Sequence, residues 1–168
     1  MIIGPRRVVL IGAIAAVALA IIFYPLIVYT PIDLDKVGTE LDKVELQPDS
    51  SQGAQSLNLI VTFMIINNNP ITLTTSQVNY ELMADGVNLG TYTLSYEDIP
   101  LNGRPVLFSG TRVSVTDSAV TIDNSDAKAQ IFNKIQNNIS DIKWRVTGSA
   151  TIESGTTQVT KDFSDTLP

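Results

Sequence analysis

The pattern of hydrophobic positions along the chain changes near residue 44. Residues 8–29 form a run of 22 residues without a charge, and at about 1.5 Å per helical residue such a run reaches roughly 33 Å, enough for a hydrocarbon core of about 30 Å. Beyond residue 44, apolar and polar positions alternate, which is the period of a half-buried strand. The pattern predicts one transmembrane helix over residues 8–29, followed by a mainly β domain.

The residues that flank this run allow two interpretations. Residues 1–7 form a short basic tail with Arg6 and Arg7, and Ala18-Leu19-Ala20 has the small residues of a signal-peptidase site, so a cleaved signal peptide is one interpretation. The apolar run continues through residues 21–28, however, where a signal peptide should become polar. We therefore expect an uncleaved signal anchor.

Residues 30–43 follow the run and are rich in charge, with Pro31 and Gly38 among them. They are predicted to be a stalk. Lys36 and Lys43 are its basic residues, fewer than the two arginines and the terminal amine of the tail. By the positive-inside rule, the amino terminus is expected in the cytoplasm and the domain outside it, as a single-pass cell-membrane protein.

Three small residues recur at intervals of four within the predicted span. Gly12, Ala16 and Ala20 share one helical face, an arrangement that lets two membrane helices approach closely. The stripe predicts packing against another transmembrane helix. The alternative is that alanine is simply common in spanning helices.

The body of the chain carries clear strand and turn signals. Residues 57–66 alternate but are apolar on both faces, which predicts a central strand covered on two sides, and residues 67–70, Asn-Asn-Asn-Pro, end it sharply. Residues 78–91 read as a hairpin around Asp85 and Gly86. Further strands are predicted at 106–108, 112–115, 142–152 and 157–163.

One helix is expected among these strands. Asp123 or Ser125 is the candidate cap, and the residues at helical spacing that should pack on the sheet are Ile131, Phe132, Ile135 and Ile139. Several short strands with one helix favour an immunoglobulin-like or fibronectin-like antiparallel β-sandwich. The whole fold is therefore predicted as mainly β, with one short helix, behind one transmembrane helix.

Composition removes most catalytic chemistry. The chain has neither cysteine nor histidine, so it has no thiol nucleophile, no imidazole base and none of the usual zinc or haem ligands. Setting the two tail arginines aside, nine basic residues face seventeen acidic ones, and such an acidic body repels nucleic-acid phosphates. We expect no enzyme activity, no cofactor and no nucleic-acid partner.

Carboxylate pairs are the remaining candidates for chemistry. Glu97 and Asp98 are adjacent and would point to opposite faces if that segment is extended. Asp123, Asn124 and Asp126 offer oxygen ligands to calcium, but their spacing matches no EF-hand loop, and helix capping is the simpler explanation. No catalytic or metal site is predicted from them.

Two surface features bear on location. Asn138-Ile139-Ser140 satisfies the N-glycosylation sequon, so Asn138 is a glycosylation site only if the domain lies outside the cytoplasm. Arg104 and Arg112 flank an apolar strand, where contact with lipid headgroups is one interpretation, but single exposed arginines are normally solvated.

The strand and turn motifs resemble those of the late-embryogenesis-abundant type 2 domain, the water-stress and hypersensitive-response domain. The resemblance covers residues 44–165, and the stretches that carry it are 57–70, 78–92, 99–115 and 142–151. Two positions depart from the family pattern, because Ile71 follows Pro70 where the family often has asparagine, and Trp144 replaces a frequent tyrosine. The resemblance implies a β-sandwich with a small helical insertion behind a membrane helix, a role in desiccation, stress or membrane-associated defence, and no active site.

Three functions are consistent with these features. The first is a membrane-anchored, extracytoplasmic binding or protective domain whose partner is the lipid bilayer. The second is an accessory single-pass subunit of a membrane complex. The third is a protein that binds lipid in a groove between the sheet faces, motivated by the two-sided apolarity of residues 57–66.

Overall fold

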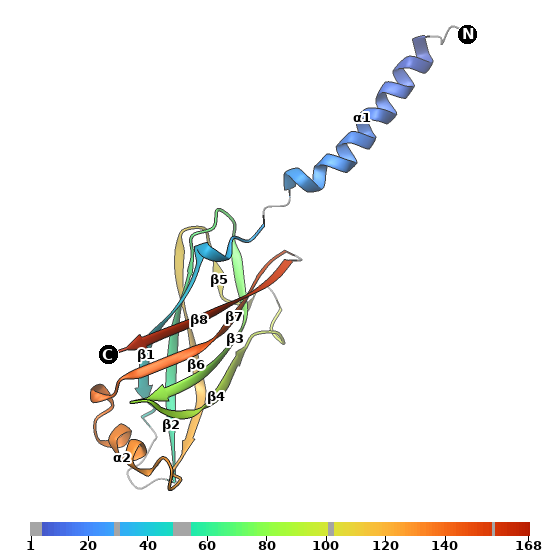
Figure 1. The fold of residues 1–168 in the computed structure, drawn as a ribbon. Coiled ribbons are helices and arrows are strands. Elements are labelled where there is room, and N and C mark those ends of the chain that lie inside the picture. Colours follow the sequence, from blue (N-terminus) through green and yellow to red (C-terminus); the bar gives the residue numbers. More distant parts are fainter. Residues whose placement is uncertain (1–4, 29–30, 49–54, 101–102, 156) are drawn as a thin grey trace. The chain divides into compact units, whose positions relative to one another are not determined.

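The computed structural model describes residues 5–28, 31–48, 55–100, 103–155 and 157–168. It divides into two compact units, residues 1–31 and 32–168, shown in Figure 1. Residues 1–4 of the predicted tail, Tyr29 at the end of the predicted span and Thr30 at the start of the predicted stalk lie outside the described residues.

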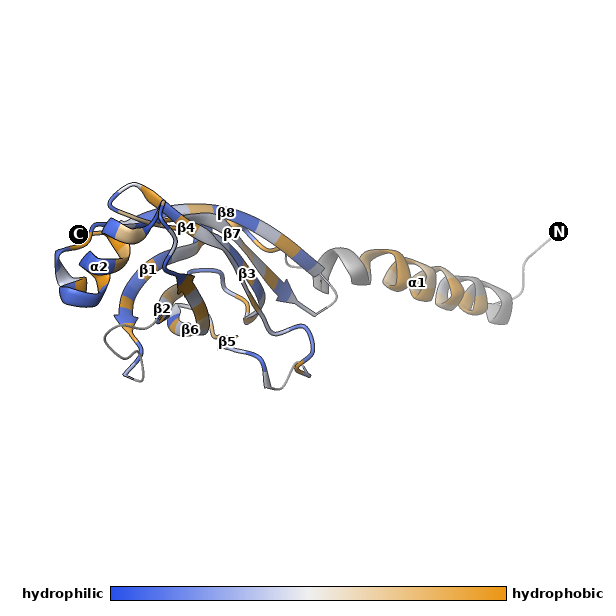
Figure 2. Ribbon diagram, turned by 90° about the horizontal axis from the view of Figure 1, so that it is seen from below, coloured by the Kyte–Doolittle hydropathy of each residue, from blue (hydrophilic) through white to orange (hydrophobic). Residues whose placement is uncertain are grey.

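The first unit is the helix α1 (Pro5–Val28). Helical conformation over residues 8–28 agrees with the sequence. The apolar colouring of α1 is visible in Figure 2, and its large apolar side chains that are exposed are Val9, Leu10, Ile14, Val17, Leu19, Ile21, Ile22 and Phe23. Across the part of the chain that the structure describes, no helix combines the length and apolar character that a membrane crossing requires. The span predicted over residues 8–29 is therefore not confirmed.

The second unit contains two antiparallel sheets, as the mainly β prediction requires. One sheet has the order β1 (Val37–Leu46), β2 (Ser56–Asn67), β6 (Thr111–Asp123). The other has the order β4 (Val87–Ser95), β3 (Leu73–Ala84), β7 (Trp144–Ser154), β8 (Thr157–Leu167), and the short β5 (Val106–Leu107) pairs with the start of β3. The arrangement is sandwich-like, while its immunoglobulin-like classification stays a prediction.

The core lies between the two sheets and is built by alternation along the strands. In β2, the inward residues are fully buried: Leu57, Leu59, Val61, Phe63 and Ile65. Its place between β1 and β6 confirms that it is a central strand. On the opposite face, Ile66 is buried and Ile60 and Met64 are half-buried, so the expected cover on the second side is present only in part.

The helix α2 (Ala129–Asn137) packs at one end of the sandwich. Its residues Ile131, Phe132 and Ile135 are buried, and the Lys128 Nζ atom donates a hydrogen bond to the Leu89 carbonyl at 2.7 Å. Ile139 follows in the short 3-10 helix η3 (Ile139–Asp141) and is half-buried. The apolar stripe was therefore predicted correctly.

The predicted cap of this helix is wrong. Lys128 occupies the N-cap position, and no side chain caps the helix there. Asp123 is instead the last residue of β6, because that strand extends well beyond the predicted 112–115. The β3–β4 hairpin is confirmed, and Asp85 and Gly86 both have positive φ angles, 48° and 83°, as the turn type demands.

Most of the predicted stalk belongs to the domain. Residues 34–36 form the 3-10 turn η1 (Leu34–Lys36), and β1 begins at Val37. The inward residues of β1 are Val37, Leu41 and Val44. A register shift between Leu41 and Lys43 breaks their alternation. Charged outward residues therefore dominate the sequence pattern of this segment, and the pattern does not indicate a strand.

Gly148 in β7 lies directly against the backbone of β3. A Cβ atom placed on Gly148 would lie 2.1 Å from the Asn79 carbonyl oxygen and 2.8 Å from the Tyr80 Cα atom. Both contacts are to backbone, which cannot move aside without separating two paired strands. A glycine is therefore required at this point of the sheet.

We predict that Gly148→Ala destabilises the domain, because overpacking of this kind costs about 1–3 kcal/mol. Urea unfolding of the full chain in mild detergent, followed by the emission of the sole tryptophan, Trp144, measures the change. Ser149→Ala is the matched control and should have a free energy of unfolding close to that of the unaltered chain. Equal stability of the two variants would contradict the steric argument.

Candidate functional site

The buried amide of Asn67 organises the end of the sandwich at which the chain enters the domain. Asn67 is fully buried at the end of β2. Its Nδ2 atom donates to the carbonyl oxygens of Ile71 at 2.8 Å, Leu107 at 2.9 Å and Phe108 at 3.3 Å, and its Oδ1 atom accepts from the Asn69 N–H at 2.9 Å. One side chain thus holds the β2–β3 turn against β5.

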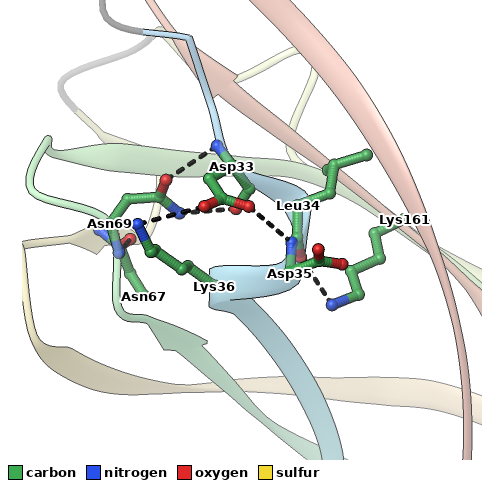
Figure 3. A network of polar contacts seen from close by, with 7 residues as sticks. All are labelled: Asp33, Leu34, Asp35, Lys36, Asn67, Asn69 and Lys161. Atoms are coloured by element: carbon green, nitrogen blue, oxygen red, sulfur yellow. Dashed lines mark hydrogen bonds and ion pairs between the residues drawn. The ribbon is translucent and has the colours of Figure 1, made fainter.

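Asn69 connects this end to the incoming chain. It is fully buried, its Oδ1 atom accepts from the Asp33 N–H at 2.9 Å, and its Nδ2 atom donates to the Asp33 carbonyl at 3.1 Å. Figure 3 shows the Asn69 side-chain amide paired with the backbone N–H and carbonyl groups of Asp33. We call Asp33, Asn67 and Asn69 the entry latch.

The carboxylate of Asp33 adds electrostatic contacts on the outside of the latch. It accepts a hydrogen bond from the Asp35 N–H at 3.1 Å and lies 3.1 Å from the Lys36 Nζ atom. The hydrogen bond from Lys36 lowers the pKa of Asp33, and the Asp35 N–H and the charge of Lys161 act in the same direction. Because the pair is exposed, its contribution to stability is small.

Two charged side chains of β8 fasten β1 to the other sheet. The Lys161 Nζ atom donates to the carbonyl oxygens of Leu34 at 2.6 Å and Val37 at 2.5 Å. The Asp165 Oδ2 atom accepts from the Leu41 N–H at 2.8 Å. These two side chains bond to backbone groups on the free edge of β1, so part of that edge is not available to pair with another strand.

A second buried polar contact links the two sheets. Asp117 in β6 is 4% exposed, and its carboxylate accepts from the Tyr80 hydroxyl and from the Ala119 N–H, both at 2.9 Å. Burial raises the pKa of Tyr80, and the charge of Asp117 raises it further. Both carboxylate oxygens of Asp117 accept hydrogen bonds. The Tyr80–Asp117 pair therefore links the two sheets and is not an exposed acid and base.

The carboxylates considered from the sequence do not converge on one another. Glu97 and Asp98 lie in a turn after β4, not in an extended segment. Within the described residues, no three acidic side chains are grouped to hold a metal ion. Asp123, Asn124 and Asp126 are all exposed.

Arg104 is a structural residue, contrary to its interpretation as solvated. Its Nη1 atom lies 2.7 Å from the Glu153 Oε2 atom, and the two side chains are 12% and 17% exposed. Its other donors bond to the carbonyl oxygens of Ile99 and Glu97. The guanidinium group thus fixes the β4–β5 connection to β7, whereas Arg112 is exposed.

The remaining predicted positions are accessible. Asn138 is exposed between α2 and η3, and its Nδ2 atom donates to the Asp141 Oδ2 atom at 2.6 Å. Gly12, Ala16 and Ala20 are exposed on α1. Glycosylation and helix packing at these positions stay predictions.

Comparison with known proteins gives a likeness of fold. No family model matches this sequence, and no curated protein is similar to it. The solution structure of AT1g01470 from Arabidopsis thaliana superimposes with a TM-score of 0.52 at 11% identity, over 77% of this chain and 78% of the other. A crystal structure of a protein from Archaeoglobus fulgidus has a TM-score of 0.44 at 14% identity, over 76% and 94%. At such low identity, the first likeness extends to the fold alone, and the second contributes nothing further.

The three consecutive asparagines provide an internal test of the latch. Asn67→Asp replaces a donor that faces three carbonyl oxygens with an acceptor, and leaving buried polar groups unsatisfied costs about 1–3 kcal/mol each, more for a charge. We predict a large loss of unfolding free energy, measured by urea titration. Asn68→Asp, at an exposed position, should have little effect, and comparable losses in both variants would exclude the latch.

The Tyr80–Asp117 pair predicts a dependence of stability on alkaline pH. Because the pKa of Tyr80 is raised in the folded state, its contribution is complete below the unfolded value of about 10 and is lost as pH rises above it. Tyr80→Phe should lower stability at neutral pH by about 1.5–3 kcal/mol. Its unfolding free energy should then fall less steeply than that of the unaltered chain above pH ~10; parallel curves would contradict this assignment.

Proposed function

We propose that this chain is a membrane-anchored, non-catalytic protein of the late-embryogenesis-abundant type 2 class. In this proposal, residues 8–29 anchor it in the cell membrane, the amino terminus is cytoplasmic, and the sandwich acts outside the cytoplasm as a binding or protective domain. The strand motifs and the fold likeness to the Arabidopsis protein support the class.

The observation that carries the proposal is the exposure of the apolar side chains of α1. Every described side chain from residue 12 to residue 23 is exposed, and none is charged. The large ones expose between 50% and 68% of their surface. Apolar area gains about 25 cal/mol per Å² on leaving water, so a bilayer is the environment in which a helix of this surface is stable.

The polar contacts of the domain support a role without catalysis. Asp117 and Arg104 are the well-buried charged groups considered above, and each is hydrogen-bonded to other groups of the fold. Such groups stabilise the domain and are not positioned to react with a substrate. Binding or protection through the surface is the function that these features favour.

The two alternative functions stay predictions. The accessible stripe of Gly12, Ala16 and Ala20 favours an accessory subunit, because a second helix is able to pack there. A lipid groove between the sheets needs open space, whereas the inward side chains of β2 are fully buried. Co-purification of another membrane protein in mild detergent would favour the first alternative, and co-purification of lipid with the domain would favour the second.

We predict that Ile14→Lys combined with Val17→Lys releases the chain from membranes. Each charge at the centre of a spanning helix costs about 2.5–3.5 kcal/mol on insertion scales. Sedimentation after alkaline carbonate extraction measures the membrane-bound fraction. Thr91→Lys combined with Thr93→Lys, at exposed positions of β4, is the matched control and should remain with the membrane pellet.

The two parts of the proposal have separate tests. An unaltered chain that stays in the carbonate supernatant would contradict anchoring. Protease added to sealed cells should remove the domain if it lies outside the cytoplasm, and complete protection of the domain would contradict the orientation while leaving the anchor in place.

A further inference from the structure

We infer that the end of the sandwich that carries Phe108 rests on the bilayer surface, with the Phe108 ring inserted at the depth of the lipid headgroups. This inference rests on the proposed membrane anchor and adds a second contact between the protein and the membrane. Its basis is where exposed apolar side chains occur in the domain and how the fold holds them.

Large apolar side chains are rarely exposed in the described part of the domain. Those that are exposed are Phe108, at 61%, and Ile99, at 39%. Phe108 follows β5 directly, and Ile99 lies in the connection between β4 and β5. That connection leaves β4 where the Tyr96 N–H bonds to Ser76 and returns where Pro105 accepts from the Thr75 N–H, near the start of β3.

Phe108 belongs to the same end of the domain as the entry latch. Its carbonyl accepts from the Asn67 Nδ2 atom, and the Gly110 N–H donates to the Asn67 carbonyl at 2.8 Å. Thr111 is paired with Asn67 at the start of β6. Asn67 is therefore shared between the turn that carries Phe108 and the latch that holds Asp33.

The turn holds Phe108 in its exposed position. Besides Asn67, its carbonyl accepts from the Thr111 N–H at 3.1 Å and from the Thr111 Oγ1 atom at 2.8 Å. Gly110 has a φ of 73°, which permits the tight reversal. A backbone fixed by three donors has little freedom to fold the ring back onto the domain, so little ordering entropy remains to be lost on insertion.

The length of the tether selects the bilayer as the partner. Four residues, 29–32, separate Val28 at the end of α1 from the latch at Asp33. Even a fully extended chain covers only about 3.3–3.6 Å per residue, roughly 17 Å in total. With residues 8–29 embedded, the latch end of the domain cannot leave the neighbourhood of the headgroups, and the effective concentration of this surface at the membrane is high.

Apolar insertion, not charge, provides the contact. Beyond the two tail arginines, seventeen acidic residues outnumber nine basic ones, and Glu97 and Asp98 are exposed in the β4–β5 connection. An anionic surface would repel such a domain. The partner that fits is a zwitterionic lipid surface, and the contact should change little with salt concentration.

A tryptophan scan of the full chain in phosphatidylcholine vesicles tests the inference. Phe108→Trp adds a reporter at an exposed position, while the native Trp144 is 2% exposed and provides a constant background. The added emission should shift to the blue and be largely lost when the lipids are replaced by brominated phosphatidylcholine. Asn133→Trp, exposed on α2 at the other end of the domain, should show neither change.

The outcomes separate this inference from the proposed anchor. Vesicles that retain the Phe108→Trp variant after carbonate extraction but leave its added emission unquenched would overturn the inference and leave the anchor intact. A blue shift that depends on protein concentration and persists without lipid would also overturn it, because it would indicate a contact with a second copy. Loss of the protein from the vesicles would contradict the anchor itself.

Discussion

Satisfying the carbonyl groups that face Asn67 at the end of β2 is the constraint on which the entry end of this domain depends. Three carbonyl oxygens converge on the Asn67 amide group, and an unpaired buried carbonyl is costly. Because Asn67 also accepts from the Asn69 N–H and Asn69 holds Asp33, this one requirement joins the β2–β3 turn, β5 and the incoming chain. No other polar side chain of the entry latch bonds to as many carbonyl groups.

Elsewhere the fold uses inward-facing polar groups to connect its two sheets. Asp117 bonds to the Tyr80 hydroxyl across the core, and Lys161 and Asp165 bond to the open edge of β1. Exposed strand edges are sites at which chains aggregate, and inward-pointing charges are one way to prevent it. The same residues therefore stabilise the sandwich and restrict pairing of the β1 edge with other strands.

The sequence predicted the elements whose alternation is regular and missed those in which it is interrupted. The central strand, the β3–β4 hairpin and the stripe of α2 follow the expected periods closely. Residues 37–43 of β1 were assigned to the stalk, since a register shift follows Leu41. Only residues 112–115 of β6 were predicted, and its register shifts after Asp117. A charge in a strand is normally interpreted as facing solvent, so the inward positions of Lys161 and Asp165 were not recognised, although both occupy the same alternate positions of β8 as Val159, Phe163 and Leu167.

The entry latch also limits which surfaces are free to bind. Under the proposed anchoring, the end of the domain that carries Asn67 and Phe108 lies next to the membrane, because only residues 29–32 separate Val28 from Asp33. The outward face of the β4-β3-β7-β8 sheet is accessible, and its exposed residues include Thr91, Thr147, Asp162 and Ser164. Under the same proposal, a binding partner has access to this sheet face, whereas the entry end is next to the membrane.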